Sequence, residues 1–126
     1  MIIPENLKFS KEHTWLLLNG NMGTVGITDF AQGELGEIVY TYLPNIGKSF
    51  SQNEAFGSVE AIKTVSDLFM PVSGIIVEVN AALKDEPTLV NTDPYNGGWL
   101  IKISITNPEE ISNLLTAAAY QSLTVS

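Results

Sequence analysis

Short apolar segments, separated every few residues by Gly, Pro or Asn, run through most of this 126-residue chain. This spacing is typical of a barrel or sandwich built from short strands. The clearest pair is residues 14–18 and 22–27, which flank Asn19-Gly20, a dipeptide suited to a tight hairpin turn. Residues 100–105 alternate apolar and polar side chains, so we expect one face of that strand to be buried. Two more strands are predicted at residues 38–43 and 74–79.

Two helices are predicted within this β pattern. The first covers residues 29–35, because Thr28 can cap its N-terminus and a glycine follows its last residue. The second begins after Asn107, since Pro108 suits the first helical position and Glu110 completes a capping box. We expect this C-terminal helix to cover an edge or a face of the sheet. Its apolar face would consist of Ile111, Leu114, Leu115 and Ala118.

Residues 58–70 have a different periodicity. Their apolar side chains recur at the spacing of an amphipathic helix, and Pro71 follows where such a helix would end. On this pattern alone, Lys63 would be an ordinary lysine on the solvated face of a helix. The apolar positions are Ala61, Ile62, Val65, Leu68 and Phe69.

The charge of the chain excludes several classes of function. Six basic residues, all of them lysine, stand against fourteen acidic residues, which gives a net charge of −8. Nucleic acid is not an expected partner, because the forked guanidinium that grips phosphates is missing. The same charge disfavours anionic membrane surfaces. No apolar run approaches the ~20 residues of a membrane span, and domain-like sequence follows Met1 at once, so we expect a cytoplasmic protein of bacterial type.

The chain lacks the usual materials of an active site. It has no cysteine, and His13 is the only histidine. A thiolate nucleophile and a cysteine-based zinc site are therefore excluded, and a triad would depend on a single imidazole. His13 fits a hydrogen-bonded structural histidine better than a catalytic base. We expect no catalytic residues and no metal site, so that any thiol chemistry must come from an attached group.

Several motifs follow one another in a fixed order over nearly the whole chain. They include Lys-Glu-His-Thr-Trp at residues 11–15, Gly-Ile-Thr-Asp-Phe-Ala-Gln at 26–32, Gly-Ser-Val-Glu-Ala-Ile-Lys at 57–63 and Gly-Trp-Leu-Ile-Lys-Ile at 98–103. Taken together, these motifs resemble the H-protein family of the glycine cleavage system. The resemblance implies that Lys63 carries a covalent lipoyl group, because it stands at the position that the family modifies.

The resemblance also implies a fold. Residues 1–126 would form a single lipoyl-carrier domain, a mainly β barrel-sandwich hybrid of the lipoyl- and biotinyl-carrier type. A short helix in the N-terminal half and a C-terminal helix would accompany the strands. In place of the helix suggested by periodicity, the family fold implies a β-hairpin with Lys63 at its tip. Such a tip lacks Gly, Asn and Asp, and local rules are often broken where function selects the residues.

The function implied by the resemblance is that of a carrier without catalysis of its own. A PLP-dependent glycine decarboxylase (P protein) would load an aminomethyl group onto the lipoyl arm of Lys63. A tetrahydrofolate-dependent aminomethyltransferase (T protein) would remove the carbon, and dihydrolipoyl dehydrogenase (L protein) would take the electrons. A lipoate-attachment enzyme is a fourth implied partner, and the carrier is expected to be a monomer. The cyclic disulfide of lipoate would supply the redox chemistry that a cysteine-free chain lacks.

Acidic residues near the arm are candidates for recognition and docking. Glu60 and Asp67 flank Lys63, where they could help a partner recognise the hairpin. In the family, the loaded arm is thought to rest in a cleft whose acids hold its cationic amine, and Asp67 is the first candidate here, with Glu12 the second. Asp67 could equally brace the hairpin. Thr14 stands where family members usually have an acid, which changes the expected contacts of the cleft.

Two alternatives stay open on the sequence. The chain could be an H-like carrier that holds lipoate for another complex or passes it to other lipoyl proteins. It could also be an interaction module that keeps the fold without modification. The acceptor sequence Ile62-Lys63-Thr64 differs both from the Asp-Lys-Ala that lipoyl domains of 2-oxo-acid dehydrogenases usually show and from the Met-Lys-Met of biotin carriers.

Overall fold

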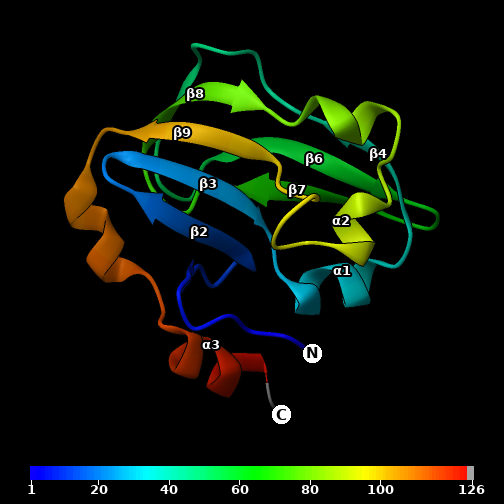
Figure 1. Cartoon of the computed structure of the whole chain (residues 1–126), viewed down its shortest axis with the longest axis horizontal. Coiled ribbons are helices and arrows are strands. Elements are labelled where there is room, and N and C mark those ends of the chain that lie inside the picture. Colours follow the sequence, from blue (N-terminus) through cyan, green and yellow to red (C-terminus); the bar gives the residue numbers. More distant parts are fainter. Residues whose placement is uncertain (125–126) are drawn as a thin grey trace.

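The computed structural model describes residues 1–124, and two β-sheets pack against each other in it (Figure 1). The strands are β1 (Lys8–Phe9), β2 (Thr14–Asn19), β3 (Met22–Ile27), β4 (Ile38–Tyr42), β5 (Ser49–Phe50), β6 (Ala55–Ala61), β7 (Val65–Phe69), β8 (Gly74–Val79) and β9 (Ile101–Ile105). The larger sheet has the order β1-β2-β3-β9-β8-β5 and the smaller one β4-β6-β7. All of these pairings are antiparallel. The predicted mainly β, barrel-sandwich class is confirmed.

Local turn chemistry accounts for the hairpin of β2 and β3. The strands close on the pair Asn19 and Met22, so the turn consists of Gly20 and Asn21, one residue later than the dipeptide suggested. Gly20 has a φ of 62°, which glycine adopts without a steric penalty. Strand β9 also follows its pattern, because its three isoleucines are buried while Lys102 and the serine beside it are half-buried.

The first helix is confirmed with the bounds that its caps predict. It is α1 (Asp29–Leu35), and the hydroxyl of Thr28 accepts a hydrogen bond of 3.2 Å from the backbone N–H of Ala31. Gly36 ends the helix with a φ of 81°, a left-handed conformation that favours glycine. Two shorter helical segments, η1 (Ala81–Lys84) and α2 (Leu89–Thr92), connect β8 to β9.

The predicted C-terminal helix exists, but the prediction that it begins at Pro108 is wrong. A 3₁₀ segment, η2 (Pro108–Asn113), comes first, and α3 (Ala117–Thr124) follows after a break. Asn107 makes no side-chain cap. The carboxylate of Glu110 does not reach back to close a capping box; it accepts hydrogen bonds from the backbone N–H and the hydroxyl of Ser73, at 2.7 and 3.0 Å. The Glu110 carboxylate, which a capping box would have used, is therefore engaged in a tertiary contact with Ser73.

The break in this region arises from a strand-like contact. Leu115 and Phe9 exchange two backbone hydrogen bonds, of 2.9 and 2.7 Å, so the chain is extended where a continuous helix was expected. Helix α3 then places Tyr120 against Phe9, with the two rings stacked at a centroid distance of 4.7 Å. These contacts form a second, smaller core that also contains Leu7 and Trp15.

The segment around Lys63 is a hairpin of β6 and β7, so the helix predicted by its periodicity is wrong and the hairpin implied by the family resemblance is confirmed. Side chains alternate between two faces of the sheet: Val59 and Leu68 are at most 2% exposed. Ile62 and Val65, which the predicted helix would have placed on one apolar face with Leu68, are 67% and 60% exposed. Their apolar side chains therefore produced the spacing of an amphipathic helix although they are not part of a core.

The main core lies between the two sheets and excludes the hairpin tip. It draws buried side chains from β2, β3, β8 and β9 on one side and from β4, β6 and β7 on the other. In the part of the chain that the structure describes, no helix is both long and apolar enough to cross a membrane.

Candidate functional site

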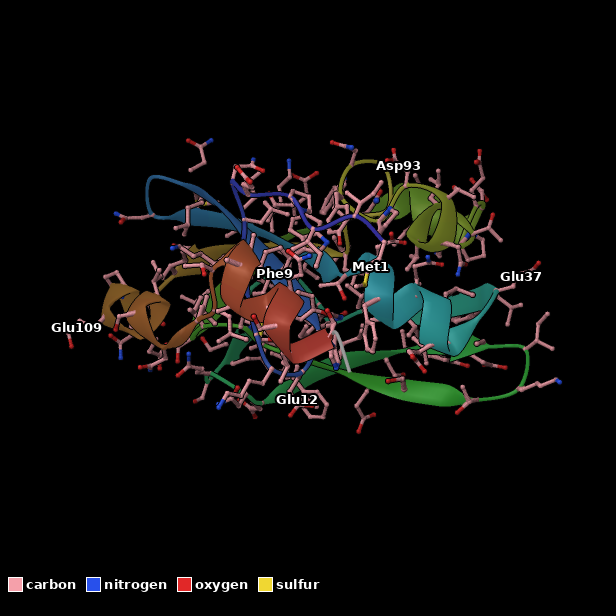
Figure 2. The ribbon with its side chains drawn as sticks, turned by 90° about the horizontal axis from the view of Figure 1, so that it is seen from below. Met1, Phe9, Glu12, Glu37, Asp93 and Glu109 are labelled. Carbon is pink, nitrogen blue, oxygen red and sulfur yellow. The ribbon has the colours of Figure 1, made fainter. Side chains whose placement is uncertain are left out.

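Lys63 lies at the tip of the β6–β7 hairpin, which protrudes at one edge of the molecule (Figures 1 and 2). The backbone N–H of Ala61 donates a 2.7 Å hydrogen bond to the carbonyl of Thr64 across the turn, and Ile62 N–H donates to the carbonyl of Glu37 at 3.2 Å. These bonds hold the tip, while the side chains of residues 62–65 are all exposed. The tip thus presents the primary amine of Lys63 on a flexible stem to an approaching macromolecule.

Glu60 lies on the outer face of the small sheet, three residues before Lys63. Its carboxylate accepts a 2.9 Å hydrogen bond from the hydroxyl of Tyr42 on β4. This hydrogen bond and the negative charge of Glu60 raise the pKa of Tyr42. The ring of Tyr40 lies beside that of Tyr42, with 4.6 Å between ring centroids. A carboxylate and two aromatic rings are therefore gathered on the outer face of the sheet whose hairpin carries Lys63.

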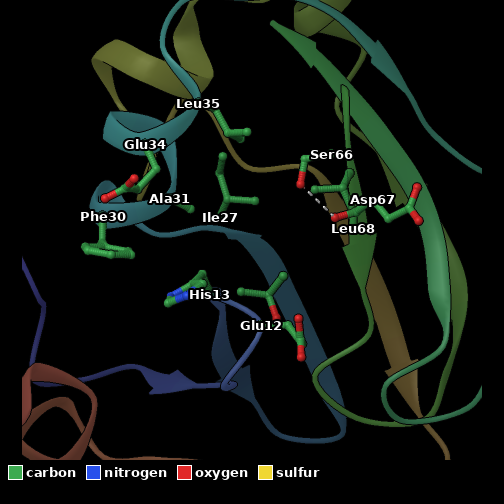
Figure 3. A pocket seen from close by; sticks show the side chains of 11 residues that line it. Glu12, His13, Ile27, Phe30, Ala31, Glu34, Leu35, Ser66, Asp67 and Leu68 are labelled. Atoms are coloured by element: carbon green, nitrogen blue, oxygen red, sulfur yellow. Dashed lines mark hydrogen bonds between the residues drawn. The ribbon is translucent and has the colours of Figure 1, made fainter. Parts of the chain in front are cut away.

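A cleft of ≈ 360 Å³ lies on the opposite face of the same hairpin (Figure 3). Helix α1 forms one wall, β7 forms the other, and the loop between β1 and β2 contributes its rim. Its lining combines apolar side chains with three acids and one histidine. The residues are Glu12, His13, Thr14, Ile27, Phe30, Ala31, Glu34, Leu35, Ser66, Asp67 and Leu68.

The alternation of β7 decides which of its side chains face the cleft. Ser66 and Leu68 lie on the inner face, whereas Asp67 pairs with Ser58 and directs its carboxylate to the outer face. Figure 3 shows that carboxylate turned away from Ile27. The part of Asp67 near the cleft is its backbone carbonyl, to which the Ser66 hydroxyl donates at 3.4 Å. The docking role assigned to Asp67 stays a prediction, and its carboxylate shares the outer face with Glu60.

The acids on the cleft side are Glu12 and Glu34. Glu12 was a candidate from the sequence, and it is exposed on the rim. Glu34 was missed, although a signal existed: it follows Phe30 by four residues in the predicted helix 29–35, so the two share a helix face. Phe30 is half-buried and lines this cleft.

His13 connects the cleft to the C-terminal helix. Its Nδ1 lies 2.7 Å from the hydroxyl of Tyr120, which in turn lies 2.7 Å from the hydroxyl of Thr28, the cap of α1. Burial lowers the pKa of His13, and the charges of Glu12 and Glu34 oppose that shift. The expectation of a hydrogen-bonded structural histidine is confirmed by this arrangement.

Thr14 has a structural role in this chain. It is 1% exposed, and its hydroxyl lies 2.6 Å from that of Ser10 across the β1–β2 loop. The residue that replaces the usual acid thus braces the loop and brings no charge to the cleft. Among residues 1–124, no group of three or more His, Asp or Glu side chains is placed to hold a metal ion.

Comparison with known proteins agrees with this geometry. The family described as "Glycine cleavage H-protein" matches residues 7–126. A "Glycine cleavage system H protein" from Symbiobacterium thermophilum is 53% identical over 122 residues, covering 97% of this chain and 95% of that protein. One from Bacillus cereus strain B4264 is 50% identical over 124 residues, covering 98% of each. The crystal structure of a glycine cleavage system H protein from Mycobacterium marinum is similar as well, with a TM-score of 0.88 at 40% identity, covering 96% of this chain and 98% of that one. The chain therefore belongs to the glycine cleavage H-protein family.

Proposed function

We propose that this chain is a lipoyl carrier of the glycine cleavage system and that Lys63 is its attachment site. The observation that carries the proposal is the position of Lys63, exposed at a protruding hairpin tip whose inner face borders a cleft. A lysine in this position is accessible to a modifying enzyme and keeps an attached group next to the domain. Residues 1–126 would act as one lipoyl-carrier domain.

The residues of the cleft fit a lipoyl group bound to Lys63. Ser66, on the cleft face, follows Lys63 by three residues in the sequence, which is at most roughly 10 Å of chain, and a lysine lengthened by an octanoyl-length acyl chain can span that distance. When bound, lipoate supplies a cyclic disulfide that can be reduced, can carry a group on sulfur and can be oxidised again.

Side chains of this cleft would bind and shield the arm. Ile27, Phe30 and Leu35 offer apolar contacts to an aliphatic chain and exclude water around it. Glu12 and Glu34 would attract a positively charged amine at the end of the arm. The protein's contribution is therefore to tether, orient and shield, without a catalytic step of its own.

Family membership supports the partners that we propose. The decarboxylase (P protein) would load the aminomethyl unit derived from glycine, the aminomethyltransferase (T protein) would pass its carbon to tetrahydrofolate, and dihydrolipoyl dehydrogenase (L protein) would collect the electrons. A covalent tether keeps the local concentration of the carried group high during each transfer. We propose that the carrier acts as a monomer in the bacterial cytoplasm, in line with its bacterial relatives.

Intact-mass measurement of the chain isolated from its native host tests the attachment site. We expect the mass increment of one lipoyl or octanoyl amide on the natural sequence and none on Lys63→Arg. Lys84→Arg, at another exposed lysine, is the matched control and should keep the increment. An unmodified natural chain would refute the carrier function and would favour an interaction module.

Reconstitution then tests the pathway. The lipoylated chain, mixed with the P, T and L proteins, glycine, tetrahydrofolate and NAD⁺, is expected to support glycine-dependent formation of NADH. A lipoylated chain that fails to do so, but donates lipoate to another lipoyl protein, would identify an H-like relay instead.

A further inference from the structure

We propose that Tyr42 is a positioning residue that fixes the carboxylate of Glu60 for recognition by the lipoate-attachment enzyme. The inference rests on the proposed function, because it assumes that Lys63 receives lipoate. It adds a residue from β4, distant in sequence from the acceptor, to the surface that the enzyme reads. The pair lies on the outer face of the small sheet, opposite the cleft that would hold the finished arm.

The backbone brings Tyr42 to Glu60 by a close approach of two strands. Tyr40 is the register partner of Glu60, and Tyr42 is the partner of Ser58, so the Tyr42 hydroxyl reaches Glu60 diagonally across the pair. Gly57 permits this geometry, because a Cβ atom at that position would collide with the Tyr42 carbonyl oxygen. Any larger residue would push β4 away from β6 at the point that supports the hydrogen bond.

Packing of the cores does not explain why this surface carries apolar and aromatic side chains. Tyr40 and Tyr42 are 50% and 48% exposed, and neither belongs to the two cores of the molecule. Val65, the register partner of Glu60 on β7, is 60% exposed on the same face. Half-exposed tyrosines that combine an apolar ring with a hydrogen-bonding group are typical of protein contact surfaces.

The short side chain of unmodified Lys63 indicates that the attachment enzyme is the partner that contacts this surface. An unmodified Lys63 has only a four-carbon stem, so the enzyme that acylates it must enclose the tip and contact the residues next to it. Enzymes that act later meet a much longer arm and can dock farther away. In the acylation step, the neutral Nζ of Lys63 attacks the carbonyl carbon of a lipoyl adenylate. The amide C–N bond forms, the acyl–phosphate C–O bond breaks with its electron pair leaving on AMP, and one amine proton passes to solvent or to a base of the enzyme.

The hydrogen-bonded pair of Tyr42 and Glu60 indicates which chemical groups the enzyme needs at its binding surface. The Tyr42 hydroxyl donates to one carboxylate oxygen of Glu60 and restrains the rotamers of that side chain, which leaves the other oxygen available to the partner. A guanidinium, an ammonium or backbone N–H groups on the enzyme would complement this oxygen. The tyrosine rings and Val65 would pack on an apolar surface beside that donor. A net charge of −8 favours an enzyme with a basic docking face.

Acylation kinetics on the unmodified chain test the role of Tyr42. The assay uses a purified lipoate–protein ligase with lipoate and ATP, and intact mass measures the product. Tyr42→Phe keeps the ring and removes the hydroxyl; we expect kcat/KM to fall on the order of five-fold, chiefly through a higher KM. Ser112→Ala is the control: it removes an exposed hydroxyl on η2, outside the proposed surface, and should leave the rate unchanged.

A double-mutant cycle and a titration separate positioning from a general loss of structure. Glu60→Gln should lower kcat/KM on its own, and in that background Tyr42→Phe should have a much smaller effect. Glu60→Gln should also lower the pKa of Tyr42 in an ultraviolet titration, which reports the hydrogen bond without any enzyme. Equal unfolding midpoints for all variants would exclude misfolding as the cause.

The possible failures are distinguishable. If the natural chain receives no lipoate from the ligase, the proposed function fails with its attachment site. If the natural chain is acylated and Tyr42→Phe is acylated at the same rate, the positioning role of Tyr42 is overturned while the carrier function stands. Equal effects of Tyr42→Phe with and without Glu60 would also overturn it, because they would show that the hydroxyl acts independently of the carboxylate.

Discussion

Two hairpins of this protein have opposite relations to its core. In the β2–β3 hairpin, Leu16 and Val25 are completely buried and the turn uses a glycine with positive φ. In the β6–β7 hairpin, the base is buried but the tip carries Ile62 and Val65 into solvent, and its turn contains no glycine. The first hairpin is built for stability. The second combines a buried base with a tip whose side chains are exposed to solvent.

The backbone explains why the tip can dispense with glycine. Within residues 1–124, the non-glycine residues with positive φ are His13 and Asn53, so the turn around Lys63 needs no left-handed residue. Its geometry is instead supported by the hydrogen bond between Ala61 and Thr64 and by the contact of Ile62 with Glu37. A tip held by its backbone leaves its side chains free for recognition.

A valine-to-alanine substitution in each hairpin should give the largest difference in unfolding free energy between the two. Val25→Ala removes two buried methyl groups from β3, and we expect the free energy of unfolding to fall by about 2–3 kcal/mol. Val65→Ala removes the same atoms from an exposed position and should change it by less than about 0.5 kcal/mol. Urea unfolding of both variants measures the difference. Similar losses would mean that the tip packs against something in solution.

The two turns should differ in a second way. A Cβ atom added at Gly20 would meet no other atom within 4 Å, so Gly20→Ala tests conformation alone and should cost about 1 kcal/mol. Lys63→Arg, at the other turn, should leave the unfolding midpoint unchanged and abolish acylation. Urea unfolding and intact mass are measured for both variants. We expect Gly20→Ala to lose stability and keep acylation, and Lys63→Arg to lose acylation and keep stability. A stability loss in Lys63→Arg would contradict a tip held by its backbone.

The elements that local chemistry determines could be predicted from the sequence. Strands β2, β3, β8 and β9 and helix α1 follow from alternation, a turn dipeptide and caps such as Thr28. The prediction failed where tertiary contacts override a local pattern and where exposed apolar residues imitate one. Glu110 binds Ser73 in place of its own helix cap, and the exposed apolar residues beside Lys63 imitate a helix. Only the family resemblance placed that lysine on a hairpin.

The position of Lys63 at a hairpin tip was predicted through the family resemblance, but the walls of the cleft were not. Strand alternation sends the carboxylate of Asp67 to the face away from the cleft, and a periodicity interpreted as helical could not reveal this. Glu34 lines the cleft because α1 lies across it from β7, a tertiary arrangement that no local pattern encodes. The Tyr42–Glu60 hydrogen bond joins residues 18 positions apart and depends on the strand register.

The two faces of the β6–β7 hairpin should have different effects on a loaded arm. Glu34→Gln and Glu12→Gln remove charge beside the cleft, and each should shorten the time for which carbon from labelled glycine stays bound by a few-fold, corresponding to less than about 1 kcal/mol at exposed sites. Asp67→Asn should have a smaller effect, since its carboxylate lies on the outer face. Release of label from the lipoylated chain measures all three. A dominant effect of Asp67→Asn would mean that its side chain turns into the cleft when the arm is loaded.

The smallest expected effect is a pH dependence of stability that arises beside the β2–β3 hairpin and not in the β6–β7 hairpin. Burial lowers the pKa of His13, at the start of the β2–β3 hairpin, below its usual 6.5. The unfolded chain therefore takes up the proton first, so the contribution of neutral His13 is complete above pH 6.5 and is lost as the pH falls toward the lower, folded-state pKa.

His13→Asn isolates this contribution, because asparagine tolerates the φ of 67° at that position and does not titrate. The natural chain should lose more stability than the variant between pH 7.5 and pH 5, as measured by urea unfolding at each pH. The carboxylates common to both chains cancel in this difference. Since no histidine lies in the β6–β7 hairpin, ligase acylation of the two chains should keep the same ratio across that range. A changing ratio would show that protonation of His13 reaches the tip through the cleft wall, and that the two hairpins are coupled.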